Sequence, residues 1–333
     1  MRSPALRASQ KAYWKDLIER HYHLAVRSVG LVWQGANITL KIDTGPDSFY
    51  LRLYREKGRS RAEIDAEIGA LLTFRPAGQV YVSTPVQTRG GDHVFSCDHE
   101  QRRRWAALFT AAPGSLPEGD AASLSRLGEA VGVLHEQMAP ASPVGRPFDP
   151  ARTVSRTVET IASLGPGLRA ADRGIAEAGA ASIAELDACG ALRVGFCHGD
   201  VWLGKNVHFL GQRVTFFDFD ECVDGPLSVD LMTPIMGLWY AGLVDFPAQS
   251  RVFLDAYAAV RPLPANDIMA IPPLARLYEI GLLGFLAGSG TLEPYDWEMA
   301  LDYFERRMEE WRPGGAAATA IYELATLVGL DRP

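Results

Sequence analysis

The stretch FCHGDVWLGKN, Phe196–Asn206, places His198, Asp200 and Asn206 in one short polar segment between two apolar ones. The flanking runs RVGF and VHFL have strand-like patterns, so the polar segment is expected to be a loop between strand ends. A satisfied buried pair beside a strand end would account for His198 and Asp200 alone. It would not account for the acidic cluster that follows one hairpin later, so we interpret the loop as a candidate chemical site.

That acidic cluster, FFDFDE, comes directly after an apolar run and contributes Asp218, Asp220 and Glu221. Unpaired carboxylates are costly to bury, so these residues are expected at a strand end. The intervening VHFLGQRVTFF predicts a hairpin with Gly211 and Gln212 at its turn, which would bring Asn206 and Asp218 alongside each other. Carboxylate and amide oxygens suit Mg²⁺, which leaves its other positions to phosphate and water. An adjacent carboxylate, Asp200, would then orient an acceptor hydroxyl and take its proton as a phosphoryl group moves.

The first third of the chain has mainly strand patterns. LVWQGANITLKIDTGPDSFYLRLYR alternates apolar and polar residues on both sides of the turn cluster DTGPD, which predicts an antiparallel hairpin. SRAEIDAEIGALLTF predicts a helix, with Ser60 as its N-cap and Glu63 in the capping-box position. Further strands are expected in VYVSTPVQT, HVFSC and RRWAALFT.

The remainder of the chain is mostly helical in pattern. Pro and Gly cluster in AAPGSLPEGD, and the sequence changes character after this loop, which makes it the best candidate for a hinge. Strand signals beyond it are confined to RVGFCHGD and VHFLGQRVTFFDFDE, and we expect the Ala/Gly-rich PGGAAATA near the C-terminus to be a mobile joint. We therefore predict an α+β fold of two lobes, a small β-rich lobe of residues 1–112 and a larger helical lobe of residues 113–333.

With these elements in place, the chain resembles a known family. HGDVWLGKN followed by FFDFDECVDGPLSVDL is similar to the HGDxxxxN and DxxxxxxGxxxxDL signatures of the aminoglycoside phosphotransferase and choline kinase group. The closest resemblance is to its bacterial branch of homoserine-kinase-like and stress-response Ser/Thr kinases. YLRLYREKGRSRAEIDAEIGALL resembles that branch's third strand and following helix. The resemblance implies a protein-kinase-like fold over nearly the whole chain, with ATP and Mg²⁺ as cofactors.

Carried over by position, the resemblance implies roles for the two polar clusters. Asp200 would be the catalytic base, and His198, which we group with it, would brace the catalytic loop. Asn206 and Asp218 would be metal ligands, and Asp220 would be a candidate for a second metal or for an indirect role.

The resemblance also implies a nucleotide-binding set. Arg52 falls where the family usually has the Lys that pairs with the α- and β-phosphates, and Glu67 falls at its partner position on the following helix. We place Lys205 with them. Asp230 would hold the catalytic loop through backbone hydrogen bonds, although an ordinary helix cap would explain it equally well.

The chain departs from the family pattern at two of these positions. Arg can contact phosphate or carboxylate through its planar fork, but with a geometry that differs from that of a Lys point charge. The family's Asn position is occupied by Lys205, and Asn206 arrives one residue late. Either a one-residue bulge still delivers Asn206 to the metal, with Gly204 absorbing the unusual backbone angles, or Lys205 occupies the site. We favour the bulge.

Composition limits the partners and the location. A formal charge of −7 and a pI of 5.6 argue against nucleic acid as a partner. The four cysteines show no CxxC spacing, which favours reduced thiols and makes a structural zinc improbable. The N-terminus has no signal-peptide pattern, and the sequence shows no uncharged apolar run of about 18 residues. We therefore predict a cytoplasmic protein without a membrane partner, as a monomer or a homodimer.

The leading hypothesis is an ATP- and Mg²⁺-dependent phosphotransferase acting on a hydroxyl of an aminoglycoside, amino-alcohol or amino-acid type of molecule. One alternative is a protein Ser/Thr kinase of the same fold, and another is a catalytically silent nucleotide-binding protein. A phosphatase built on DFDEC, as in haloacid-dehalogenase-like hydrolases, ranks last, because no Lys follows Lys205. The acceptor and the choice between ATP and GTP stay open at this stage.

Overall fold

The computed structural model describes residues 6–35, 37–55, 58–164, 169–242, 245–289 and 296–330. The chain separates into two compact units, each built from separate stretches of sequence. The first comprises Met1–Leu116, Pro140–Gly145 and Val207–Asp220, and the second comprises Pro117–Ala139, Arg146–Asn206 and Glu221–Pro333. A single lobe boundary between residues 112 and 113 stays a prediction.

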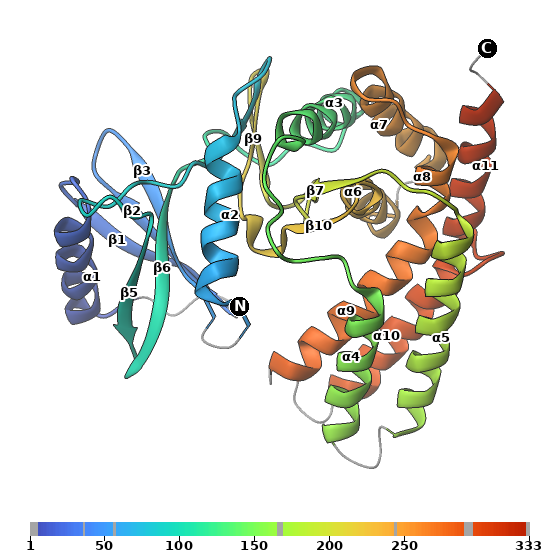
Figure 1. The fold of residues 1–333 in the computed structure, drawn as a ribbon, viewed down its shortest axis with the longest axis horizontal. Coiled ribbons are helices and arrows are strands. Elements are labelled where there is room, and N and C mark those ends of the chain that lie inside the picture. Colours follow the sequence, from blue (N-terminus) through green and yellow to red (C-terminus); the bar gives the residue numbers. More distant parts are fainter. Residues whose placement is uncertain are drawn as a thin grey trace. The chain divides into compact units, whose positions relative to one another are not determined.

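The first unit is organised around a five-stranded antiparallel sheet of order β1-β2-β3-β6-β5 (Figure 1). Its strands are β1 (Ser28–Gln34), β2 (Ile38–Asp43), β3 (Ser48–Leu53), β5 (Val94–His99) and β6 (Arg102–Thr110). Asp43 pairs with Ser48, so DTGPD closes the hairpin that the alternation predicts. Thr39 pairs with Arg52 in the same register, which fixes Arg52 on the central strand β3.

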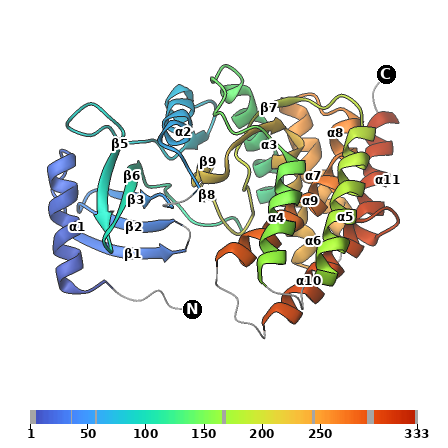
Figure 2. The ribbon, with the colours of Figure 1, turned by 60° about the horizontal axis from the view of Figure 1, so that its bottom comes forward.

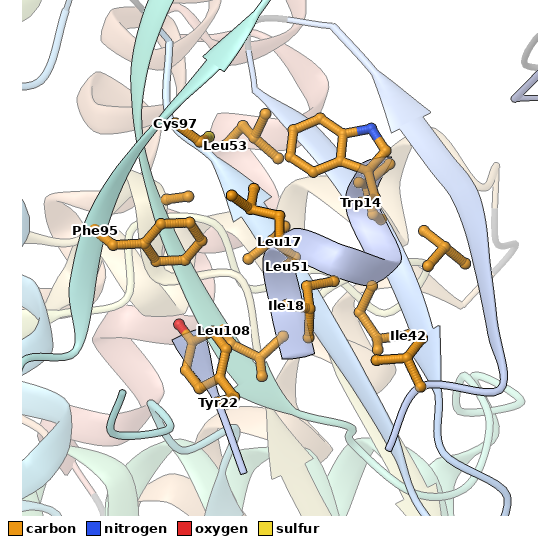
Figure 3. Packing of buried hydrophobic residues seen from close by; sticks show 14 of the residues in the cluster. Trp14, Leu17, Ile18, Tyr22, Ile42, Leu51, Leu53, Phe95, Cys97 and Leu108 are labelled. Atoms are coloured by element: carbon orange, nitrogen blue, oxygen red, sulfur yellow. The ribbon is translucent and has the colours of Figure 1, made fainter. Parts of the chain in front are cut away.

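Helix α1 (Ala8–His21) covers one face of this sheet, as Figure 2 shows. Trp14 and Ile18 of the helix pack into a core with Leu51 and Leu108 of the strands (Figure 3). Removing these apolar surfaces from water is the main favourable contribution to folding. Strand β3, which carries Arg52, is therefore fixed in place by a close-packed core on one of its faces.

Helix α2 (Arg61–Thr73) begins as the sequence predicts. Ser60 accepts a hydrogen bond from the backbone N–H of Glu63, and the Glu63 carboxylate accepts one from the Ser60 N–H. This reciprocal capping box satisfies two backbone donors that a helix start otherwise leaves unpaired. The helix then buries Glu67 completely.

A second, three-stranded sheet completes the first unit, in the order β4-β9-β8. It consists of β4 (Val80–Val82), β8 (Val207–Leu210) and β9 (Arg213–Phe216). Strands β8 and β9 are antiparallel, and Leu210 pairs with Arg213, which confirms the hairpin predicted around Gly211. Asp218 and Asp220 follow β9, so these carboxylates lie beyond a strand end, as expected.

The second unit is mainly helical. It contains one two-stranded sheet, formed by β7 (Val194–Cys197) and β10 (Val223–Pro226). Figure 1 shows α4, α5 and α9 lying side by side. The helices are α3 (Ala121–Met138), α4 (Pro150–Leu164), α5 (Arg169–Ala188), α6 (Ser228–Tyr240), α7 (Phe246–Val260), α8 (Ala265–Met269), α9 (Ile271–Ser289), α10 (Asp296–Trp311) and α11 (Ala316–Leu330).

The structure corrects two expectations about this unit. Strand β10 was not predicted, because VDGP contains Gly and Pro and has too few apolar residues to show a strand pattern. Within the segment PGGAAATA, only the first three residues lie outside a helix, and α11 begins at Ala316. Alanine has the highest helix propensity of all residues, so the AAATA half favours a helix instead of a joint.

One segment, Ala265–Gly288, is long and apolar enough to cross a membrane by length and composition. Of its most apolar window, 67% is buried inside the structure. The core helix of a folded domain meets the same criterion, so the segment by itself is weak support for a membrane span.

Candidate active site

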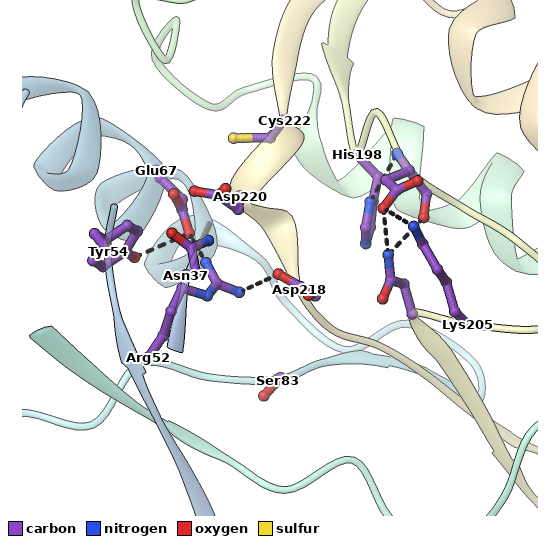
Figure 4. A network of polar contacts seen from close by, with 12 residues as sticks. Asn37, Arg52, Tyr54, Glu67, Ser83, His198, Lys205, Asp218, Asp220 and Cys222 are labelled. Atoms are coloured by element: carbon purple, nitrogen blue, oxygen red, sulfur yellow. Dashed lines mark hydrogen bonds and ion pairs between the residues drawn. The ribbon is translucent and has the colours of Figure 1, made fainter. Parts of the chain in front are cut away.

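The loop between β7 and β8 holds the Asp200 carboxylate by three donors. Trp202 Nε1 donates to Oδ1 at 2.7 Å, and Asn206 Nδ2 donates to Oδ2 at 2.8 Å. Lys205 Nζ lies 2.8 Å from the same Oδ2 (Figure 4). Asn206 Nδ2 also donates to the Asp200 backbone carbonyl at 2.9 Å. The carboxylate is therefore fixed in position, with about one of its roughly four lone-pair sites left for another donor.

Helix α6 anchors the start of this loop through Asp230, which is fully buried. Its Oδ2 accepts from the His198 backbone N–H at 2.6 Å, and its Oδ1 accepts from the Gly199 N–H at 2.7 Å. His135 Nε2 lies 3.1 Å from Oδ2, and His135 Nδ1 lies 3.0 Å from the hydroxyl of Tyr257. Asp230 is thus a loop anchor and not an ordinary helix cap.

The pKa values of Asp200 and Asp230 shift in opposite directions, although burial acts on both carboxylates. Burial raises the pKa of Asp200, and the charge of Lys205 only partly opposes it. Burial also tends to raise the pKa of Asp230, but the hydrogen bond and charge of His135 outweigh this and lower it. Asp230 is therefore held as an anion, while Asp200 is the more basic of the two.

The late Asn206 is accommodated by a turn. Trp202 and Lys205 form an isolated bridge, with the Lys205 N–H donating to the Trp202 carbonyl at 3.2 Å. Our expectation that Gly204 takes the unusual backbone angles is wrong: the positive φ, +68°, belongs to Asn206 itself. Asn tolerates this left-handed conformation better than most residues, because its short side chain can hydrogen-bond locally. Both Lys205 and Asn206 reach Asp200 as a result.

In the first unit, Arg52 is a buried bridge between two acidic residues. Its Nη1 donates to Glu67 Oε1 at 2.9 Å, and its Nη2 donates to Asp218 Oδ1 at 2.8 Å (Figure 4). The hydroxyl of Tyr54 donates to the same Glu67 oxygen at 3.3 Å. Burial lowers the pKa of Arg52, but the charges of Asp218, Tyr54 and Glu67 outweigh burial and raise it. Arg52 is therefore a permanent cation within this cluster.

Asp218 and Asp220 have different environments. Asp218 has a half-exposed side chain and a φ of +63°. Asp220 is buried, with Oδ2 only 2.7 Å from Arg55 Nη2, and Arg59 Nη2 donates to its backbone carbonyl at 2.6 Å. Burial would raise the pKa of Asp220, but the charges of Arg52, Arg55 and Arg59 hold it at about 2. Asp218 is thus open to a ligand, whereas Asp220 is enclosed by cations.

No group of three or more His, Cys, Asp or Glu residues arranged to hold a metal occurs in the described parts of the chain. The predicted site residues fall into two sets. His198, Asp200, Lys205 and Asn206 lie together in the second unit, and Arg52, Glu67, Asp218 and Asp220 lie together in the first. The proximity of Asn206 to Asp218 stays a prediction.

Comparison with known proteins places this site in a family. The sequence profile of the phosphotransferase enzyme family matches residues 33–265, which is more than half of the chain. The chain belongs to this phosphotransferase family. A homoserine kinase of Rhodospirillum rubrum is 29% identical over 263 residues, which cover 73% of this chain and 74% of that protein.

Two solved structures resemble the phosphotransferase in fold. A microcompartment-associated aminopropanol kinase has a TM-score of 0.72 and 23% identity, covering 90% of this chain and 96% of that one. The amicoumacin kinase hAmiN, in complex with AMP-PNP, Ca²⁺ and Ami, has a TM-score of 0.73 and 18% identity, covering 90% and 93%. The predicted kinase-like α+β fold is confirmed, as are the family resemblance and the class of phosphotransferase with an alcohol group as acceptor.

The sequence did not identify an aromatic group beside the loop between β7 and β8. The Trp202 ring stacks with Tyr240 at a centroid distance of 6.3 Å, and it lies 5.7 Å from Tyr278 at a tilt of 57°. Nothing in the sequence distinguishes Tyr240 and Tyr278 from ordinary core aromatics. A Trp two residues after a candidate base was the available signal, because an indole N–H within a loop is a potential donor to that base.

Proposed function

We infer that the phosphotransferase moves the γ-phosphoryl group of ATP, with Mg²⁺, to a hydroxyl of a small molecule. The observation that supports this best is the Asp200 carboxylate, which is largely buried, held by three donors and more basic than an ordinary Asp. A general base should have a pKa raised toward the working pH while staying ionised there. A fixed carboxylate of this kind suits a hydroxyl that must be oriented before it attacks.

Asp200 accepts the proton of the acceptor hydroxyl at a carboxylate oxygen. His198 contributes through its position, since its backbone N–H and that of Gly199 tie the loop to Asp230. Positioning accounts for a large share of catalysis in phosphoryl transfer, because the chemistry needs little covalent help from the protein.

We assign nucleotide binding to Arg52, Glu67 and Lys205. The Glu67 carboxylate holds Arg52 Nη1 and Asp218 holds Arg52 Nη2, so a phosphate oxygen would take the place of Asp218 at Nη2 when Asp218 turns to the metal ion. Lys205 has a 54% exposed side chain, so its ammonium is free to turn from Asp200 toward a phosphate. These two cations would offset the charge of the phosphates.

The donor set fits Mg²⁺ at two residues. Asn206 uses its amide nitrogen to bind Asp200, which leaves its amide oxygen for a cation, and Asp218 offers a half-exposed carboxylate. Hard oxygen donors of this kind are the ligands Mg²⁺ takes, and the bound ion would neutralise phosphate charge. Asp220 stays a predicted metal ligand, although Arg55 and Arg59 both form ion pairs with its carboxylate.

A small-molecule acceptor is favoured by the relatives, whose names specify homoserine, aminopropanol and amicoumacin. A protein Ser/Thr acceptor and a silent nucleotide-binding protein are the alternatives. A cytoplasmic location, the lack of nucleic-acid and membrane partners, and a monomeric or homodimeric state stay predictions.

The test is ADP formation from ATP and Mg²⁺ with homoserine, 1-amino-2-propanol and an aminoglycoside as acceptors, and casein as a protein acceptor. Asp200→Asn should lower acceptor-dependent turnover by about a thousandfold while ATP binding by calorimetry is retained. Asp255→Asn, an exposed change on α7, is the matched control. Surviving turnover in Asp200→Asn would refute the assigned base. ATP binding without any turnover would favour the silent protein, and transfer to casein alone would favour the protein kinase.

A further inference from the structure

Trp202 lies two residues after Asp200 and contacts its carboxylate directly. The indole Nε1 donates to Asp200 Oδ1 at 2.7 Å, while Asn206 Nδ2 donates to Oδ2 at 2.8 Å. A donor on each oxygen opposes rotation of the carboxylate about its Cβ–Cγ bond, because rotation would distort both hydrogen bonds. Trp202 and Asn206 therefore fix the plane of the Asp200 carboxylate from its two sides.

The third donor to Asp200 is held less firmly. Lys205 Nζ lies 2.8 Å from Oδ2, but its side chain is 54% exposed, and we assign it to nucleotide phosphate. Exposed ion pairs contribute little, since a long side chain loses conformational freedom when it keeps one geometry. When Lys205 turns to a phosphate, Trp202 and Asn206 are the donors that stay on the carboxylate.

Two helices of the second unit fix the Trp202 indole. Its ring stacks with Tyr240 of α6 at a centroid distance of 6.3 Å, and its centroid lies 5.7 Å from that of Tyr278 of α9. Gly237 of α6 leaves room for the ring, since a Cβ built there would lie only 3.3 Å from the indole Cε3. Helices α6 and α9 also pack against each other. The direction of the N–H is therefore set by α6 and α9 and not by the loop alone.

Tyr240 is in turn held at its ring and at its hydroxyl. The guanidinium carbon of Arg307 lies 3.5 Å from the centroid of the Tyr240 ring, and the Tyr240 hydroxyl donates to Glu279 Oε1. A cation over an aromatic ring is attracted by the negative face of that ring. Arg307 belongs to α10 and Glu279 to α9, so the support behind Trp202 extends over three helices.

The hydrogen bond from the indole to Asp200 is of a strong kind. It joins a neutral donor to a charged acceptor, and such charge-assisted bonds are roughly twice as strong as neutral ones. The Asp200 side chain is only 14% exposed, so little water competes for its oxygens. A reacting group misplaced by about 1 Å can lower a rate about a hundredfold. A donor that fixes the base therefore affects the rate as well as the fold.

Resting on the proposed function, we propose that Trp202 is a positioning residue for phosphoryl transfer. Its indole N–H holds the Asp200 carboxylate so that the acceptor hydroxyl meets a base of fixed orientation. The proton of the hydroxyl still passes to Asp200, and Trp202 keeps its own proton throughout. A packing role would need only the ring of Trp202, whereas this role needs the N–H.

The two roles separate in variants that keep a ring at position 202 and remove the donor. One is Trp202→Phe, and the other carries 3-benzothienylalanine, in which sulfur replaces the N–H of an otherwise similar ring. Each should lower kcat about tenfold or more and leave the KM for ATP unchanged, because one hydrogen bond to the base is lost. Trp239→Phe is the matched control, since that indole N–H donates to Glu310 and not to Asp200. It should keep the wild-type kcat.

A second measurement does not depend on turnover. The seven tryptophans are labelled with ¹⁵N, and the indole signal that disappears in Trp202→Phe is assigned to Trp202. A hydrogen bond to a carboxylate should shift this N–H signal downfield. Asp200→Ala should return it upfield and leave the Trp239 signal in place, because the acceptor of Trp239 is intact.

The outcomes separate this inference from the proposed function. A wild-type kcat in the benzothienylalanine variant, or a Trp202 signal that ignores Asp200→Ala, would leave Trp202 with a packing role alone. Urea unfolding of both position-202 variants shows whether a lost rate reflects a lost fold, and the benzothienyl ring preserves the contacts with Tyr240 if Trp202→Phe unfolds. Turnover that survives in Asp200→Asn would instead refute the proposed base.

Discussion

Asp200 is the residue on which the proposed chemistry depends. Its pKa is set by two opposing influences, burial and the charge of Lys205. Burial raises its pKa, and Lys205, with Nζ 2.8 Å from Oδ2, lowers it again. An Asp that takes a proton must be ionised, so kcat/KM should fall as pH drops through this raised pKa. The acid limb of the profile of kcat/KM against pH should therefore have its midpoint above the ordinary Asp pKa of about 3.9.

Lys205→Met should move this acid limb to higher pH, because it removes the charge that opposes burial. The measurement is kcat/KM against pH for wild type, Lys205→Met and Lys205→Arg, with Arg as the control that keeps the charge. The same raised pKa means that Asp200's contribution to stability declines as pH rises from the unfolded to the folded pKa. An acid limb that stays in place in Lys205→Met would mean that Lys205 does not act on Asp200.

Gly199 is required by backbone geometry at the centre of the HGD motif. Its φ is +84°, and a Cβ built there would lie 2.1 Å from the backbone oxygen of Glu221. Gly199→Ala should therefore destabilise the fold by at least about 2 kcal/mol, as the left-handed conformation and the backbone clash combine. Gly204→Ala in the same loop is the matched control, since a Cβ there meets nothing within 4 Å. Urea unfolding compares the two, and equal midpoints would contradict this account.

At the scale of elements, helix α6 anchors the loop between β7 and β8 through one side chain. Asp230 in its first turn accepts hydrogen bonds from two loop N–H groups and contacts His135 of α3. Asp230→Asn replaces one acceptor oxygen by a donor, which would leave buried N–H groups unpaired. We expect a loss of about 3 kcal/mol in the free energy of unfolding.

The pH dependence of this contribution has a definite sign. The pKa of Asp230 is lowered in the folded chain, so its stabilisation is present above the unfolded pKa of about 3.9 and is lost as pH falls through the folded value. Denaturant unfolding of wild type and Asp230→Asn at acid and neutral pH measures this difference. Asp255→Asn should stay within about 0.5 kcal/mol of wild type. A difference that does not shrink in acid would argue against the anionic anchor.

Elements with a local signal were predictable from the sequence, and elements fixed by tertiary contacts were not. The capping box at Ser60 and the hairpin at Gly211 are local patterns, and both occur in the structure. Strand β10 forms because it pairs with β7, and no residue pattern in VDGP predicts that pairing. The aromatic contacts of Trp202 likewise depend on α6 and α9, which are distant in sequence.

For the candidate site, the sequence showed which residues are polar and close together in the chain. It did not show which partners each would contact or how exposed each would be. Asp218 and Asp220 are two residues apart, yet one is half-exposed and the other is enclosed by Arg55 and Arg59. The two arginines come from a stretch before α2 that is distant in sequence. Only the folded unit therefore determines that they pair with Asp220 and not with Asp218. The turn before Asn206 was anticipated as a bulge, but its strained residue was not.

At the scale of the whole molecule, the proposed residues are divided between two compact units, and each unit holds its own set by internal contacts. Arg52 and Asp218 belong to one unit, and Asp200 and Asn206 to the other. A ligand that binds the folded chain and not the unfolded one stabilises it by RT ln(1 + [L]/Kd), about 2.7 kcal/mol at a hundredfold excess. Nucleotide binding should therefore be visible as a change in global stability.

ATP with Mg²⁺ should raise the melting temperature by about 5 °C or more at saturating concentration, and EDTA should remove most of that shift. Asp218→Asn should reduce the Mg²⁺-dependent part, because it weakens the half-exposed carboxylate that we assign to the metal ion. Each variant is compared with its own unliganded melting temperature, since the change also weakens the pair with Arg52, and Asp255→Asn serves as the control. A shift that is equal with EDTA and with Mg²⁺ would mean that the nucleotide binds without metal, and Asp218 would then serve the fold through Arg52 alone.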